Sequence, residues 1–223
     1  RLFDAEGQPL YETYDPAKTY PDDVSILPFW PKYTFEDGVS HYSAITKIGE
    51  GGAVYSEPGM YVLVALLDIM SQHPYSIIAE RLFGQTYTKR FEDLVEARVA
   101  IKHEDRNSLS KLLDGKLLPF FDEALKPDGG FALDDLAQAI KIVINSVYGL
   151  TSASFPNAFR DPRNVDNIVA KRGALFMLGL KEQVIKRGFK VAHIKTDSIK
   201  IPDATPEIIK WVQDYGKEYG YTF

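Results

Sequence analysis

A short polar run inside an alternating apolar stretch constrains the fold of this 223-residue chain most strongly. Residues 191–201 read Val-Ala-His-Ile-Lys-Thr-Asp-Ser-Ile-Lys-Ile, so apolar alternation lies on both sides of a Lys-Thr-Asp-Ser tetrad. This pattern is typical of a tight β-hairpin. The turn would place the carboxylate of Asp197 at the tip of a two-stranded ribbon. An ordinary turn without chemistry explains the same residues, because Asp and Ser are common in turns.

A second acid ends an apolar run earlier in the chain. Residues 61–68 are apolar until Asp68, and Pro58-Gly59 forms a turn signal before them. A run of this length between turn signals predicts a buried central strand. Asp68 would then lie at the carboxyl end of the strand, where sheets of α/β proteins commonly place functional groups. Pro74 cannot continue a central strand, so the chain should leave the sheet there.

The middle of the chain predicts two helices. Residues 1–60 are rich in Pro, Gly, Asp and aromatic residues and read as turns, loops and short strands. Apolar residues then recur at helical spacing over about residues 87–113 and again over residues 134–149. With a shorter helical or turn region between them, the two helices should form an antiparallel pair.

The last third predicts two more helices around the hairpin. A long helix should run over residues 165–187, with Asn164 as its N-cap and Gly188 as its C-terminal stop. After the hairpin, residues 206–215 should form a final helix with one apolar face. The fold class predicted from this order is α+β: an antiparallel sheet with packed helices and an inserted antiparallel helical hairpin.

Composition excludes some classes of protein. The chain has no Cys, which rules out disulfides, thiolate metal sites and a cysteine nucleophile. No stretch approaches the roughly 18 apolar residues of a membrane span. These features fit a protein without a membrane partner in a reducing, cytoplasmic setting, that of a host cell if the protein is viral.

The net charge of −5 hides a strong asymmetry. Residues 141–200 hold 11 Lys and Arg against 4 Asp and Glu, whereas residues 1–60 hold 4 against 10. A contiguous basic third is what a phosphate-tracking surface needs. A basic segment is, however, often only a solvated face.

Cations and amides gather on the two predicted middle helices. Lys141, Asn145 and Tyr148 are spaced i, i+4 and i+7, so they share one stripe. Arg98 and Lys102 are i, i+4 partners on the other helix. Three cations on facing helices could hold a multiply charged anion such as a triphosphate.

Plainer explanations exist for several of these residues. Arg98 and Lys102 could pair with Glu96 or Glu104 and form only surface. His residues occur without metal-ligand spacing. The pair Gly51-Gly52 is too short for a phosphate-binding loop.

Three segments resemble, in the same order along the chain, the three polymerase motifs of family B DNA polymerases. Their sequences are most similar to those of the phage-type branch. Residues 67–78 (Leu-Asp-Ile-Met-Ser-Gln-His-Pro-Tyr-Ser-Ile-Ile) are similar to the first motif, an Asp followed by Ser-Leu-Tyr-Pro-Ser-Ile-Ile. Residues 141–149 match the second motif, Lys-x-x-x-Asn-Ser-x-Tyr-Gly, and residues 195–198 resemble the third, Asp-Thr-Asp-Ser. Residues 51–59 resemble the Gly-Gly segment ahead of the first motif. The likeness covers about residues 50–201, and the ordered triplet is far more specific than any one motif.

The resemblance implies template-directed DNA synthesis by a two-metal mechanism. Asp68 and Asp197 would be the catalytic residues and would bind two Mg²⁺ ions. Arg98, Lys102 and Lys141 would neutralise the triphosphate of the incoming dNTP. The further partner would be primer–template DNA; the sequence leaves open whether a processivity factor joins them.

The resemblance also assigns four further nucleotide-binding residues, and charge suggests the DNA-binding ones. Asn145 and Tyr148 would line the nascent base pair, and Ser71 and His73 would contribute to nucleotide binding. The template and primer backbone would meet cations of the basic third, an expectation from charge alone. These cations are Arg160, Arg163, Lys171 and Arg172.

The chain departs from the family pattern at three positions. Lys195 stands where the third motif has its first Asp, and its charge would compete with Mg²⁺ for Asp197. His73 takes the place of the Tyr that screens the sugar 2′-position, which puts ribose discrimination in doubt. Tyr75 is an extra residue inside the first motif.

The domain organisation expected from the resemblance is a polymerase-type palm with inserted fingers. Residues 1–84 would be a lead-in and the first part of the palm, residues 85–149 the fingers, and residues 150–223 the second part of the palm. No segment resembles a 3′–5′ exonuclease or a thumb, and the chain starts with Arg rather than Met. We therefore expect an internal piece of a longer polymerase.

Two alternatives to a polymerase remain open at this stage. A two-metal nuclease or other phosphodiesterase would use the same two acids but has no need of a triphosphate site. A DNA-binding relative of polymerases that has lost its chemistry would account for Lys195.

Overall fold

The computed structural model describes residues 33–36, 39–42, 46–47, 52–157, 159, 164 and 167–223. The chain divides into two compact units. The helical unit takes residues 1–18 and 81–165, and the sheet unit takes residues 19–80 and 166–223. Each unit is described by itself below.

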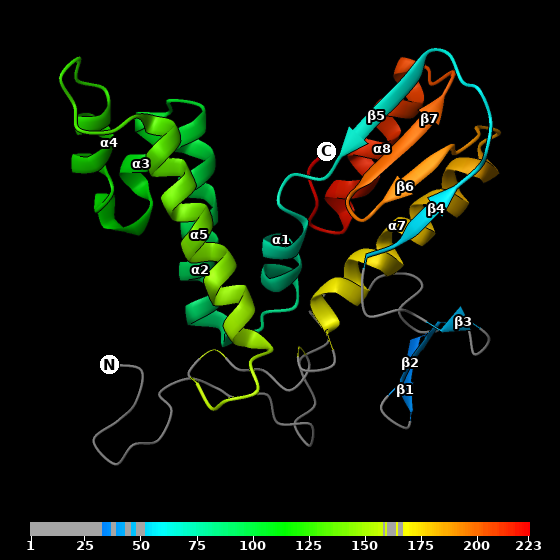
Figure 1. The fold of residues 1–223 in the computed structure, drawn as a ribbon, viewed down its shortest axis with the longest axis horizontal. Coiled ribbons are helices and arrows are strands. Elements are labelled where there is room, and N and C mark those ends of the chain that lie inside the picture. The colour runs from blue at the N-terminus through cyan, green and yellow to red at the C-terminus, as the bar shows by residue number, and fades with distance from the viewer. Residues whose placement is uncertain are drawn as a thin grey trace. The chain divides into compact units, whose positions relative to one another are not determined.

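The sheet unit is built on a four-stranded antiparallel sheet with the strand order β4-β6-β7-β5 (Figure 1). Its strands are β4 (Val54–Ser56), β5 (Val64–Asp68), β6 (His193–Lys195) and β7 (Ser198–Pro202). A separate three-stranded sheet has the order β1-β2-β3. Its strands are β1 (Tyr33–Glu36), β2 (Val39–Tyr42) and β3 (Thr46–Lys47).

The predicted hairpin is confirmed, but it is not a free ribbon. Strands β6 and β7 pair in antiparallel register, with Lys195 opposite Ser198 across a two-residue turn. They are the two central strands of the sheet, since β4 pairs with β6 and β5 pairs with β7. The hairpin is therefore held on both sides by segments that precede it by more than a hundred residues.

The prediction of a buried central strand over residues 61–68 is wrong. Strand β5 lies at the edge of the sheet and begins only at Val64, because Leu63 adopts a left-handed backbone conformation (φ 53°). Its burial alternates, and Leu66 is 61% exposed. An apolar run does not distinguish a strand covered on both faces from one covered on a single face.

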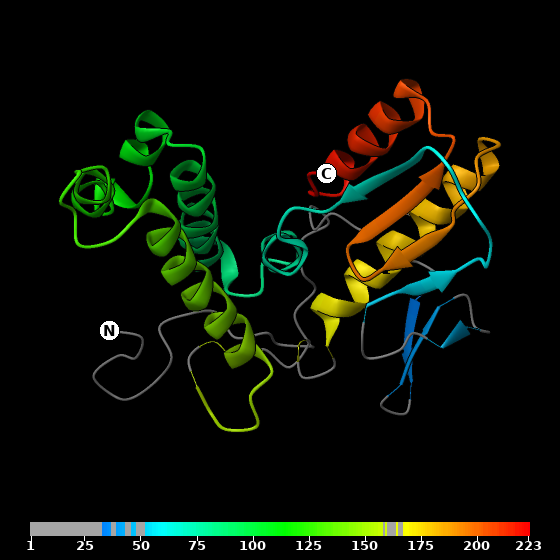
Figure 2. The ribbon, with the colours of Figure 1, turned by 45° about the horizontal axis from the view of Figure 1, so that its top comes forward.

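Three helices complete the sheet unit. They are α1 (Gln72–Ala79), α7 (Ile168–Lys186) and α8 (Pro206–Glu218). Helices α7 and α8 cover one face of the four-stranded sheet in both views (Figures 1 and 2). The core of this unit joins Leu175, Phe176 and Leu180 of α7 to Ile194 and Ile199 of the hairpin.

Helix α7 starts three residues later and ends one residue earlier than predicted. The helix begins at Ile168 with Asn167 at the N-cap, so the assignment of Asn164 as the cap is wrong. Asn164 is buried and donates a hydrogen bond to the hydroxyl of Thr151 instead. The predicted stop is confirmed, because Gly188 has a φ of +85°, which favours glycine.

The helical unit contains the predicted antiparallel pair. Helices α2 (Gly84–Lys102) and α5 (Leu133–Thr151) pack side by side (Figure 1). Between them lie α3 (Arg106–Lys111), the short 3-10 helix η2 (Leu113–Gly115) and α4 (Leu118–Ala124). No described helix has the length and the apolar character needed to cross a membrane.

The first helix of the pair is shorter than predicted. Helix α2 ends at Lys102, and Asp105 then caps α3 by accepting a hydrogen bond from the backbone N–H of Ser108 (2.9 Å). The second helix exposes more apolar surface than expected. Ile142 and Val143 of α5 are both exposed.

Candidate active site

The two predicted catalytic acids lie together at one end of the four-stranded sheet. Asp68 is the last residue of β5 and stands opposite Ser198, the residue that follows Asp197. The backbone N–H of Ile69 donates to the carbonyl of Asp197 (2.8 Å). Burial raises the pKa of Asp68, and the negative charge of Asp197 raises it further. The two carboxylates are thus close enough to repel each other.

The two acids lie at the edge of the sheet face that α7 and α8 do not cover. Residues directly opposite each other in an antiparallel sheet project on the same face. The pairs Lys195–Ser198 and Ser198–Asp68 therefore form one row across β6, β7 and β5. Lys195 is exposed and lies two strands from Asp68, about 10 Å between Cα atoms.

The first motif continues from the sheet into α1. Ser71 precedes the helix in a left-handed conformation (φ 57°), which turns the chain sharply after Asp68. Burial lowers the pKa of His73, and the charge of Asp197 opposes this shift. His73 therefore lies within electrostatic reach of the acidic turn, on the same unit as both acids.

Three contacts hold the turn that carries Asp197. Thr196 adopts a left-handed conformation (φ 55°), and its backbone N–H donates to the carbonyl of Ala53 (2.9 Å). The side-chain amide of Gln72 donates to the carbonyl of Thr196 (3.2 Å). With the bond from Ile69 to Asp197, the turn is tied to β4, to α1 and to the end of β5.

Sequence reasoning missed Gln72. A signal was present, because the first motif has Leu where this chain has Gln72. A polar residue in place of an apolar one inside a helix that packs on the core calls for a hydrogen-bond partner.

The pair of acids fits Mg²⁺ by the chemistry of its donors. Magnesium prefers oxygen ligands and keeps part of its water shell, so one or two protein carboxylates suffice. The repulsion between Asp68 and Asp197 would be relieved by a divalent cation. No cluster of three or more His, Asp or Glu side chains that could hold a metal occurs within the described residues.

The predicted nucleotide-binding residues of the helical unit lie on the α2–α5 pair. Lys102, Lys141 and Asn145 are exposed. Arg98 is half-buried, and its Nε atom has no hydrogen-bond partner in the described part of the chain. Burial raises the pKa of the half-buried Tyr148. The five residues therefore share one helix pair, as predicted, with three of them open to solvent.

The predicted DNA-binding residues fare differently. Lys171 and Arg172 are buried, with exposed fractions of 3% and 1%, which contradicts their expected place at a DNA surface. Arg172 forms an ion pair with Glu80 (2.9 Å) inside the sheet unit. Arg160 and Arg163 lie outside the described residues.

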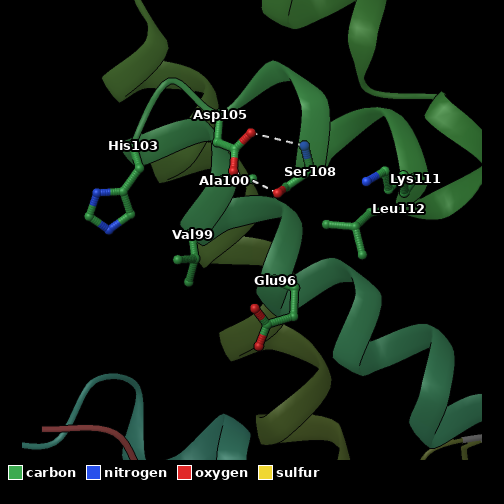
Figure 3. A pocket seen from close by; sticks show the side chains of 8 residues that line it. All are labelled: Glu96, Val99, Ala100, His103, Asp105, Ser108, Lys111 and Leu112. Atoms are coloured by element: carbon green, nitrogen blue, oxygen red, sulfur yellow. Dashed lines mark hydrogen bonds between the residues drawn. The ribbon is translucent and has the colours of Figure 1, made fainter.

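A cavity of about 350 Å³ lies in the helical unit where α2 meets α3 (Figure 3). It is lined by Glu96, Val99, Ala100, His103, Asp105, Ser108, Lys111 and Leu112. At 100° per residue, Glu96, Ala100 and His103 project from the face of α2 opposite to Arg98 and Lys102. The cavity is therefore separate from the cations predicted to bind the triphosphate.

Comparisons with known proteins give little beyond these observations. No family model matches the chain, and no curated protein matches it. A solved structure, the family B DNA polymerase from the hyperthermophilic archaeon Pyrobaculum calidifontis, is similar over 75% of this chain with 17% sequence identity and a TM-score of 0.43. The chain spans 23% of that polymerase. A similarity at this level supports no conclusion about activity, so any function for this chain has to be argued from its own residues.

Proposed function

We propose that this chain is the palm and fingers core of a template-directed DNA polymerase that transfers nucleotides from dNTP to a primer 3′-hydroxyl. One observation carries the proposal. Asp68 and Asp197 belong to two separate motifs, yet the sheet brings them to adjacent positions at one of its ends. A convergence of two carboxylates from distant segments is what a metal-dependent phosphoryl transfer requires.

In this proposal each unit has its own task. Asp68 and Asp197 hold two Mg²⁺ ions, which supply charge neutralisation and a lowered pKa of the attacking hydroxyl when bound. Arg98, Lys102 and Lys141 of the helical unit neutralise the triphosphate through charge-assisted contacts.

The remaining residues select and orient the nucleotide. Asn145 and Tyr148 line the nascent base pair, and Ser71 and His73 contact the nucleotide near the sugar. Residues 1–84 and 150–223 act as palm and residues 85–149 as fingers, in a polymerase of the phage-type branch.

Primer extension with a labelled dNTP tests the proposal. A full-length polymerase that contains this chain should extend a primer–template in Mg²⁺, and Asp68→Ala or Asp197→Ala should abolish extension while DNA binding survives. Asp203→Ala is the matched control, because Asp203 is exposed just past the other end of β7. Release of nucleotides from DNA, without extension, would instead support the two-metal nuclease.

A second candidate function, a DNA-binding relative without chemistry, is favoured by one observation. Lys195 occupies the same row of the open face as Asp68, so its cation lies near the proposed metal site. The variant Lys195→Asp separates the two. It should tighten metal binding and keep extension in a polymerase, whereas a protein that has lost its chemistry would show no extension before or after the change.

A further inference from the structure

We propose that Gln72 is a positioning residue that fixes the turn of Thr196 and Asp197, and so sets where the carboxylate of Asp197 lies relative to Asp68. The geometric part of this inference stands on contacts within the sheet unit alone. Its consequence for metal binding rests on the proposed function.

Gln72 is a buried polar side chain at the start of α1. It is 3% exposed, and its amide donates to the carbonyl of Thr196, a residue of the β6–β7 turn (3.2 Å). Buried amides are retained where they have a partner, because an unpaired one is costly. The bond therefore connects the helix that follows Asp68 to the turn that carries Asp197.

Helix α7 leaves the Gln72 amide little freedom to move. A Cβ atom on Gly173 would lie 2.7 Å from Cδ and from Oε1 of Gln72, closer than real Cβ atoms approach other heavy atoms. Gly173 lies inside α7, where glycine is a poor helix former. The absence of a side chain at Gly173 thus makes room for an amide that is held between α7 and the turn.

The turn is also confined from the side of β4. A Cβ atom on Gly52 would lie 2.6 Å from the Cγ2 atom of Thr196. The backbone of Ala53 accepts the N–H of Thr196 (2.9 Å), and the N–H of Ile69 reaches the carbonyl of Asp197 (2.8 Å). These two bonds join backbone groups, so a side-chain substitution removes neither their donors nor their acceptors.

Of the three bonds that tie the turn to other segments, the one from Gln72 uses a side chain, so a substitution can remove it. Thr196 is β-branched and left-handed (φ 55°), a conformation that such residues avoid. A strained turn persists only when its surroundings over-determine it. Without the amide of Gln72, the carbonyl of Thr196 loses its partner and the turn can relax, which moves the next residue, Asp197.

The variant Gln72→Leu tests the geometry without any reference to function. It keeps the approximate size of the side chain and removes the donor. Amide hydrogen exchange should become about tenfold faster at Ile69, whose N–H reaches Asp197. The N–H of Met70, which donates to Thr222 (2.8 Å), should stay protected. Unchanged exchange at Ile69 would overturn the positioning role.

A second pair of variants checks the same contact where Gln72→Leu fails to fold. Gly173→Ala should push the amide aside and speed the exchange of the Ile69 N–H. In the double variant Gln72→Ala/Gly173→Ala the clash is gone, so the exchange rate should equal that of Gln72→Ala alone. Additive effects would show that Gly173 does not act through Gln72.

Metal affinity is the functional readout. Binding of Mn²⁺, a paramagnetic stand-in for Mg²⁺, is measured on the whole chain by electron paramagnetic resonance. Substitutions of residues that orient ligands typically weaken metal affinity by about 10–100-fold, and we expect a loss in this range for Gln72→Leu. Ser76→Ala is the matched control, because Ser76 lies one turn further along α1 and bonds Tyr221 and the backbone carbonyl of Gln72, whereas it makes no bond to the turn.

The outcomes separate the two proposals. If Asp197→Asn abolishes Mn²⁺ binding while Gln72→Leu and Ser76→Ala both leave it intact, the positioning role is overturned and the metal site stands. If Asp197→Asn leaves Mn²⁺ binding unchanged, the proposed function fails. The hydrogen-exchange result at Ile69 then decides the role of Gln72 by itself.

Discussion

Replacing Arg172 should destabilise the sheet unit strongly. Arg172 is 1% exposed, and its guanidinium lies 2.9 Å from the carboxylate of Glu80, the residue that follows helix α1. A second nitrogen donates to the carbonyl of Tyr219 (3.1 Å), and the group stands 5.8 Å from the ring centroid of Tyr221. The substitution Arg172→Met keeps the apolar stem and removes the charge together with both hydrogen bonds.

The size of the effect follows from what is left behind. A hydrogen bond to a charged group contributes roughly 1.5–3 kcal/mol, and one between neutral groups about 1 kcal/mol. Arg172→Met also takes the Arg172 cation away from the buried Glu80, and breaking one side of a buried pair costs about 3–5 kcal/mol in total. Replacing both partners, as in Arg172→Met/Glu80→Met, should recover most of that loss, because neither charge of the pair is then buried without the other.

Urea denaturation monitored by tryptophan fluorescence measures the change, since Trp211 lies on α8 inside the sheet unit. The exposed pair Lys210–Asp214 of the same helix supplies the control, and Lys210→Met should leave the midpoint almost unchanged. An unchanged midpoint for Arg172→Met, with weaker DNA binding instead, would refute the reasoning. That result would place Arg172 at a DNA surface, as its charge alone had predicted.

Three further changes have defined outcomes. Thr196→Gly should raise the free energy of unfolding by about 0.5–1 kcal/mol by relieving the left-handed conformation, and Asp203→Gly should gain less in urea titrations because Asp tolerates it better. Tyr221→Phe should cost roughly 1 kcal/mol of unfolding free energy, since Ser76 loses a buried bond of 2.7 Å but keeps one within its helix. A hydrogen bond from the Ser108 hydroxyl lowers the pKa of the Asp105 carboxyl. The ionised Asp105 therefore stabilises the fold fully above its unfolded pKa of about 3.9, and this contribution is lost as pH falls through the folded pKa. Asp105→Asn should lessen the acid dependence seen in urea unfolding at a series of pH values, and an unaltered dependence would contradict the capping role.

The sequence predicted those parts of the fold that depend on local periodicity. Alternation over residues 191–201 gave the hairpin, because side chains of a strand alternate between two faces. Helical spacing gave the α2–α5 pair, because an amphipathic helix repeats its apolar face every three to four residues. The capping residue of α7 was missed by three positions, since Asn164 and Asn167 both lie near its start and both are good caps by type.

The errors arose where the outcome depends on distant residues. The edge position of β5 follows from the pairing of β6 with β4, which no local pattern encodes. The burial of Arg172 depends on Glu80, a partner 92 residues earlier in the chain. A sequence does not reveal the distant partner of a basic residue, so such a residue is predicted to be exposed. The charge of residues 141–200 therefore overestimated the basic surface.

The candidate site also has a part that local sequence patterns predict and a part that depends on distant residues. Asp68 and Asp197 could be predicted because each ends a recognisable strand pattern, and their meeting then needs only sheet pairing and backbone hydrogen bonds. The support of the acidic turn could not be predicted, because Gln72 and Gly173 are unremarkable one at a time. The two residues depend on each other. The amide of Gln72 fits only because Gly173 has no side chain, and Gly173, a poor helix former, is explained by the space that the amide occupies. A larger residue at position 173 should therefore be tolerated only together with a smaller one at position 72, and the acids that a motif identifies depend on such pairs for their placement.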